Sequence, residues 1–149
     1  MCGDKKTIEK KQDLGKECQC YKNDILAIHE TKIKLDEPME IDLDSGHKMI
    51  LFEQKQAHYR GLDFVISTEM NERSIIKYRY LSDRVAYLVV NLKHTNSATK
   101  FCIVNAYGPT EEKAVKYSNM IEEFYIELEK AIDVPRRVNY GFWVIYMRD

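Results

Sequence analysis

The segment RVAYLVVNLK at residues 84–93 constrains the fold more than any other part of the 149-residue sequence. It is rich in Val, Tyr and Leu, residue types that favour strands or pack well in them. Asn96 and Ser97 then mark a turn, and residues 100–106, KFCIVNA, form a second apolar run of strand length. This spacing predicts an antiparallel β-hairpin whose two strands supply much of one sheet.

Further strand patterns occur on both sides of this hairpin. Short apolar runs predict strands at residues 24–29, 49–52, 62–66 and 74–81. The first of these runs, DILAIH, is almost continuously apolar and is typical of a strand buried on both faces. An acidic stretch up to about Lys48 follows it and is interpreted as a connection, while residues 142–146 have the composition of a further strand.

Two segments have helical periodicity. Sparse apolar residues predict a helix at about residues 7–22, although Gly15 weakens that pattern. Apolar residues three or four positions apart predict a second helix from an N-cap at Thr110 to about Asp133, with Pro135 beyond its end.

Charge and hydropathy limit the functions that the chain can have. It contains 23 Lys and Arg against 24 Asp and Glu residues, a net charge of -1. Proteins that hold nucleic acid by neutralising phosphates usually carry a basic excess, so bulk electrostatic capture of DNA or RNA is not expected. No apolar run approaches the roughly 18 residues of a membrane span, and the N-terminus has no apolar signal core. We therefore expect an intracellular protein, cytoplasmic or nuclear, without a membrane partner.

The cysteines favour no recognised metal or redox motif. Cys18 and Cys20 are separated by one residue, which does not fit a CxxC pattern. A zinc site built from Cys18, Cys20 and His29 is an alternative, but no second ligand pair with a recognisable spacing accompanies it. Reduced thiols in an intracellular protein are the simpler interpretation.

Two segments at the C-terminal ends of predicted strands carry polar side chains suited to chemistry. Glu30 follows the strand at 24–29, and a carboxylate held there can bind a hard cation such as Mg²⁺. Asn105, Tyr107 and Thr110 surround a turn before a helix N-terminus, where hydroxyls and free backbone N–H groups suit a phosphate. The simpler interpretation is a solvated glutamate and a packed strand–turn–helix connection capped by Thr110.

Five segments in this order resemble one family. They are DILAIHETK at 24–32, similar to a DIL-x-I-x-ET-[KR] motif; residues 61–67, similar to a GxGFxIS strand; SDRVAYL at 82–88, similar to an SDRI-type strand; residues 105–110, similar to N-x-Y-x-P-[TN]; and FYIEL at 124–128, similar to F-Y-x-x-L. The chain thus resembles the endonuclease/exonuclease/phosphatase superfamily in its non-long-terminal-repeat retrotransposon branch, notably the group of craniofacial development protein 2-like proteins. The resemblance covers about residues 16–135.

The resemblance implies a fold, an activity and a set of site residues. The fold is a four-layered α/β sandwich of the DNase I-like type, with the site where strand-end loops meet. Members hydrolyse phosphodiesters with Mg²⁺ or Mn²⁺, and DNA is the implied partner. By position, Glu30 is the metal-binding carboxylate, Tyr107 and Asn105 are the catalytic side chains, and Thr110 is the phosphate-binding residue.

The sequence also departs from the family pattern. Nothing before Asp24 resembles the first strand with its metal-binding Asn, and no terminal Asp-His segment is found. The strand that ends in G-D-[FW]-N is compared with residues 134–143, which lack that Asp. We therefore expect a domain truncated at both ends and incomplete, with weak or no activity and with open sheet edges that favour self-association.

Three parts of the chain follow from this comparison. They are an N-terminal helical segment at 1–23, a partial endonuclease/exonuclease/phosphatase domain at 24–135 and a divergent C-terminal tail at 136–149. The expected function is a Mg²⁺-dependent DNA endonuclease domain of the retrotransposon type. The alternative is a non-catalytic transposon-derived remnant or interaction module.

Overall fold

Two β-sheets form the centre of the protein. The computed structural model describes residues 5–31, 35–52, 61–70, 75–94, 97–109, 118–138 and 141–147. In the first sheet the strands lie in the order β1-β4-β3-β2, and all neighbours are antiparallel. These strands are β1 (Ile25–His29), β2 (Met39–Asp42), β3 (Lys48–Leu51) and β4 (Leu62–Ile66).

The second sheet contains the predicted hairpin. Its order is β5-β6-β7-β8, with β5 (Ile75–Ser82), β6 (Val85–His94), β7 (Ser97–Tyr107) and β8 (Gly141–Met147). The hairpin register runs from Val85 opposite Ala106 to His94 opposite Ser97. β8 pairs parallel to β7, and helix α4 (Ser118–Val138) lies between them in the chain, as a parallel pair requires a crossover connection.

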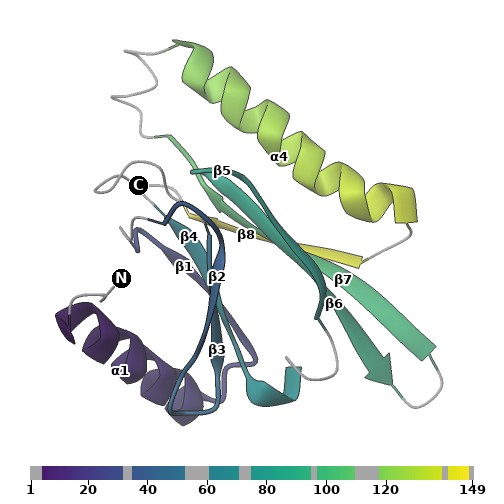
Figure 1. Cartoon of the computed structure of the whole chain (residues 1–149). Helices are drawn as coiled ribbons and strands as arrows, with labels where there is room; N and C mark the ends of the chain where they lie inside the picture. Colours follow the sequence, from purple (N-terminus) through teal and green to yellow (C-terminus); the bar gives the residue numbers. More distant parts are fainter. Residues whose placement is uncertain are drawn as a thin grey trace.

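The sheets lie face to face, and each has a helix on its outer side (Figure 1). Helix α1 (Lys5–Tyr21) packs on the first sheet through Cys18, and α4 packs on the second sheet through Phe124 and Ala131. This arrangement confirms the general α/β class with mixed helices and mainly antiparallel strands. Within the described residues, neither helix is long and apolar enough to cross a membrane.

Strand alternation explains how one sequence supplies three apolar layers. On β7, Phe101 and Ile103 face the first sheet, whereas Cys102 and Val104 pack toward α4. Successive side chains of a strand point to opposite faces, so a strand covered on both sides is apolar at nearly every position. β4 (LDFVI) is such a strand, because it is fully buried at the centre of the first sheet.

The structure corrects three sequence expectations. β1 is an edge strand of the first sheet and is half-buried, so it is not buried on both faces. The acidic connection contains an additional short strand, β2, whose residues are mostly exposed and therefore lack an apolar pattern. Helix α4 continues past Pro135 to Val138, although proline usually stops a helix. The expected strand at 142–146 is confirmed as β8.

Gly15 in α1 allows the helix to approach the first sheet closely. A Cβ atom at this position would lie 2.5 Å from Ser45 Oγ and 3.0 Å from Leu43 Cδ1. In an open helix, Gly→Ala gains about 1 kcal/mol, but overpacking costs about 1–3 kcal/mol. We expect Gly15→Ala to lower the free energy of unfolding by about 1 kcal/mol, measured by urea denaturation. Glu17→Ala at an exposed position of the same helix is the control and should change stability by less than about 0.5 kcal/mol.

Candidate functional site at the ends of β1 and β7

Glu30 and Tyr107 meet at the point where two strands of different sheets end. Glu30 directly follows β1 and has a positive φ of 57°, which turns the chain out of the strand. Tyr107 is the last residue of β7 and is only 7% exposed. Its hydroxyl donates a hydrogen bond of 3.0 Å to Glu30 Oε1, across 77 residues of sequence. The contact joins an exposed carboxylate to a phenol whose ring is buried between the sheets.

Asn105 lies two residues before Tyr107 on the same face of β7. It is completely buried, and its amide nitrogen donates to the carbonyl oxygens of Ile28 and Asp63, each at 3.2 Å. The side chain therefore links β7 to both β1 and β4. Its Oδ1 has no hydrogen-bond partner within the described part of the chain. A buried polar atom without a partner is costly, so a water molecule, a ligand or an ion would each gain a contact at this oxygen.

His29 lies against the same tyrosine. The two ring centroids are 5.7 Å apart, with the rings tilted by 39°. Burial lowers the pKa of His29 below its ordinary value of 6.5, an effect that the neighbouring Asn105 side chain and Ala106 backbone partly oppose. His29 Nε2 is also buried without a hydrogen-bond partner among the described residues.

Arg84 holds the backbone of Tyr107 from the neighbouring strand end. Its Nη1 donates to the Tyr107 carbonyl oxygen at 3.0 Å, and the Tyr107 amide donates to the Arg84 carbonyl at 2.9 Å. The guanidinium carbon is also 5.9 Å from the centre of the Tyr107 ring. These three contacts fix the phenol that reaches Glu30. The sequence motif containing Arg84 contributed to the family resemblance, but its role as a partner of Tyr107 was missed.

Asp63 is a buried acid on the opposite side of the first sheet from Tyr107. It alternates with Leu62 and Phe64, which face the second sheet, and its Oδ1 accepts a 2.9 Å hydrogen bond from the Phe52 amide. Burial raises the pKa of Asp63 to about 6, although Thr31, Phe52 and the more distant Lys11 oppose the shift. Its burial was missed in the sequence analysis, because an Asp inside a strand pattern is usually exposed.

The structure brings together three of the four predicted site residues. Glu30, Tyr107 and Asn105 lie at one edge of the two sheets, and Thr110 lies outside the described residues. No group of three His, Cys, Asp or Glu side chains in the described ranges is close enough to hold a metal ion. The donors that could do so are the Glu30 carboxylate, the Asn105 amide oxygen and the His29 imidazole.

The alternative zinc site is not assembled. Cys18 is buried in the apolar layer under α1, Cys20 is exposed, and His29 lies beside Tyr107. Burial also raises the pKa of the Cys18 thiol, which disfavours the thiolate that zinc requires.

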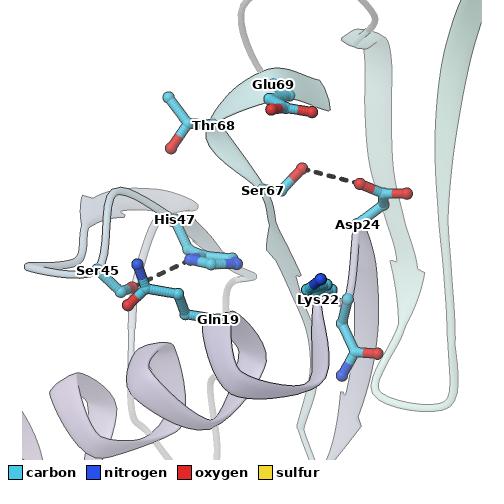
Figure 2. Close-up of a pocket in the computed structure, with 9 residues that line it drawn as sticks. Gln19, Lys22, Asp24, Ser45, His47, Ser67, Thr68 and Glu69 are labelled. Atoms are coloured by element: carbon cyan, nitrogen blue, oxygen red, sulfur yellow. Dashed lines mark hydrogen bonds between the residues drawn. The ribbon is translucent and has the colours of Figure 1, made fainter.

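A separate polar pocket of about 370 Å³ lies at the other end of β1 (Figure 2). Its lining comes from the end of α1, the turn between β2 and β3, and the residues after β4. Ser45 Oγ lies 3.1 Å from His47 Nδ1, and Ser67 Oγ donates to Asp24 Oδ1 at 3.4 Å. Because Asp24 pairs with Ser67 and not with His47, these residues do not form a Ser-His-acid relay.

Comparison of the chain with models of protein families, with curated proteins and with solved structures found no match. The function is therefore argued from the contacts around Glu30 and Tyr107 and from the sequence motifs that contain them.

Proposed function

We propose that this chain is a phosphodiester-cleaving DNA endonuclease domain of the retrotransposon type, with a DNase I-like four-layered fold. The observation that carries the proposal is the hydrogen bond between Tyr107 and Glu30. These two residues occur in separate motifs of the resemblance, and they come from different sheets. The face-to-face sheets with outer helices are consistent with the same fold family.

A divalent cation, Mg²⁺ or Mn²⁺, fits the residues present. Glu30 offers carboxylate oxygens, and Asn105 offers a buried amide oxygen without a partner in the described structure. Carboxylate and amide oxygens are the ligands that hard cations prefer. When bound, such an ion polarises a phosphoryl oxygen and stabilises the leaving alkoxide.

The chain's own residues would position the phosphate. The Tyr107 hydroxyl is a donor that can turn from Glu30 toward a phosphoryl oxygen, where charge develops in the transition state. Arg84 keeps the tyrosine in place through its backbone and ring contacts. Asn105 ties the end of β7 to β1 and β4, so the two strand ends keep their separation when substrate binds.

The position of β8 changes one comparison with the family. The family's buried strand and its aspartate are compared above with residues 134–143, but α4 extends to Val138 and β8 begins only at Gly141. The strand ends at Met147, which is paired with Tyr107, and the next residues in the sequence are Arg148 and Asp149. Asp149 thus follows this strand in the sequence, as the family's aspartate follows its buried strand, and it lies outside the described residues.

The proposal predicts nicking of supercoiled plasmid that requires Mg²⁺ or Mn²⁺ and stops with EDTA. Glu30→Gln keeps an acceptor for Tyr107 but removes the charge, and we expect a loss of about 100-fold. Tyr107→Phe removes the hydroxyl donor, and we expect a loss of about 10- to 100-fold. The rate of conversion to open circles, in a gel-based time course, is the measurement.

Two matched variants control for folding. Glu69→Gln changes an exposed carboxylate at the other pocket. Tyr78→Phe removes a different tyrosine–glutamate hydrogen bond, the 2.8 Å contact with Glu40. Both should nick like the wild type. Nicking that survives Glu30→Gln would contradict the proposed site, and a folded wild type without any nicking would favour the non-catalytic remnant.

A further inference from the structure

Three side chains that could act as metal ligands lie around Tyr107, and one of them, His29, would bind through a nitrogen atom. Glu30 accepts a hydrogen bond from the Tyr107 hydroxyl, and the His29 ring packs against the tyrosine ring. Asn105 lies two residues before Tyr107 in β7, on the same face of the strand. Among the described residues, His29 Nε2 and Asn105 Oδ1 are both buried and make no hydrogen bond of good geometry, although the His29 ring and the Asn105 side chain lie close enough to interact. Two unsatisfied polar atoms beside one carboxylate require an explanation.

The backbone explains how consecutive residues serve one site. In a regular strand, His29 and Glu30 would point to opposite faces of the sheet. The positive φ of Glu30 breaks the strand there, and both residues contact the same tyrosine side chain. A left-handed conformation in a residue other than glycine is unusual and often accompanies a functional position.

We infer that His29 Nε2, Asn105 Oδ1 and the Glu30 carboxylate form a divalent-cation site with a preference for Zn²⁺ over Mg²⁺. The inference rests on the proposed function for the presence of a cation at Glu30 and adds the imidazole ligand and the preference. Imidazole suits zinc and other transition metals, whereas magnesium prefers oxygen ligands alone. Three protein ligands with a further position left for water or substrate is also the arrangement of many catalytic zinc sites.

The surroundings of the ring support this assignment. Metal-binding histidines commonly use their second ring nitrogen to contact a backbone carbonyl or carboxylate, which orients the ring. The Ala106 backbone is a hydrogen-bond partner of the His29 ring and can orient it. The competing explanation is a direct hydrogen bond from His29 to Asn105 Oδ1 after a small movement of either side chain, with no ion between them.

Isothermal titration of the full-length chain with Zn²⁺ alone and with Mg²⁺ alone, without DNA, tests the inference. We expect Zn²⁺ to bind wild type about tenfold or more tightly than Mg²⁺. His29→Gln should weaken Zn²⁺ about tenfold or more and leave the Mg²⁺ affinity within about threefold, because only the nitrogen ligand is lost. Glu30→Gln should weaken both ions.

Two control variants account for other zinc ligands. His47→Gln removes a buried histidine of the other pocket, and Cys20→Ser removes an exposed thiol. Both should bind Zn²⁺ like the wild type. Equal Zn²⁺ affinities of His29→Gln and wild type would overturn the inference, as would a wild type that does not bind Zn²⁺ more tightly than Mg²⁺.

The titration tests the cation site and the nicking assay tests the endonuclease activity, so either proposal can be contradicted without the other. Zn²⁺ binding that depends on His29 in a protein that does not nick DNA would support the cation site and contradict the endonuclease. Nicking that depends on Mg²⁺ and Glu30, together with Zn²⁺ binding that ignores His29, would support the endonuclease and overturn the imidazole ligand.

Discussion

Replacing Phe64 by alanine is expected to lower the free energy of unfolding by about 3–5 kcal/mol. Phe64 lies on the central strand of the first sheet, is fully buried and belongs to the apolar layer between the two sheets. Its ring meets Phe52 edge-on, with 6.1 Å between the centroids. Truncation would leave a cavity between the sheets, and β4 cannot easily move into it because it is hydrogen-bonded to β1 on one side and to β3 on the other. A loss of this size is a large part of the roughly 5–15 kcal/mol that stabilises a typical domain.

Urea denaturation followed by circular dichroism measures this loss. Tyr125→Ala is the matched control, because it removes an aromatic ring of similar size from α4 that is 56% exposed. We expect the control to change the free energy of unfolding by less than about 0.5 kcal/mol. Equal effects of the two variants would contradict the placement of the main core between the sheets.

Asp63→Asn is expected to stabilise the protein at neutral pH. The pKa of Asp63 is raised from 3.8 to about 6, mainly because burial disfavours the charged carboxylate. A difference of about two pKa units corresponds to about 3 kcal/mol, which sets the upper limit of the gain. Asparagine removes the buried charge and keeps an oxygen that can accept the hydrogen bond from the Phe52 amide.

The sign of the pH dependence follows from the direction of the shift. Below pH 3.8 the carboxyl is protonated in both the folded and the unfolded chain, and its burial costs little. Between pH 3.8 and about 6 the unfolded chain loses this proton while the folded chain keeps it, so stability falls as pH rises. Above about pH 6 both states are charged and the cost stays constant.

The free energy of unfolding of both proteins is measured by thermal or urea denaturation between pH 4 and pH 8. This range begins near the ordinary pKa of Asp63 and extends beyond the raised one. The difference between Asp63→Asn and wild type should grow from near zero at the acid end to about 2–3 kcal/mol at neutral pH. Asp36→Asn, at an exposed position, should show no such growth. A variant that is less stable than wild type at pH 7 would mean that the Asp63 charge is compensated by Lys11 or Thr31.

Local sequence patterns predicted most of the regular structure. The hairpin of β6 and β7 and the helix α4 have long apolar patterns of the correct period. Their conformation is therefore predictable from the residues within each segment. β2 was missed because an exposed strand at a sheet edge has no apolar pattern, and its pairing with β3 determines its conformation. The end of α4 was misplaced because the helix continues through Pro135.

The candidate site shows the same division. Local patterns were enough to place Glu30 directly after a strand, and to place Asn105 and Tyr107 on one face at the end of another strand, since strand periodicity is a local property. The contacts themselves were not predictable from these patterns: Tyr107 donates to Glu30, Asn105 donates to two strands of the opposite sheet, and Arg84 holds the tyrosine. These contacts depend on how two sheets stack and on their register. Stacking and register are set by the total burial of apolar side chains far apart in the chain, which no local pattern specifies.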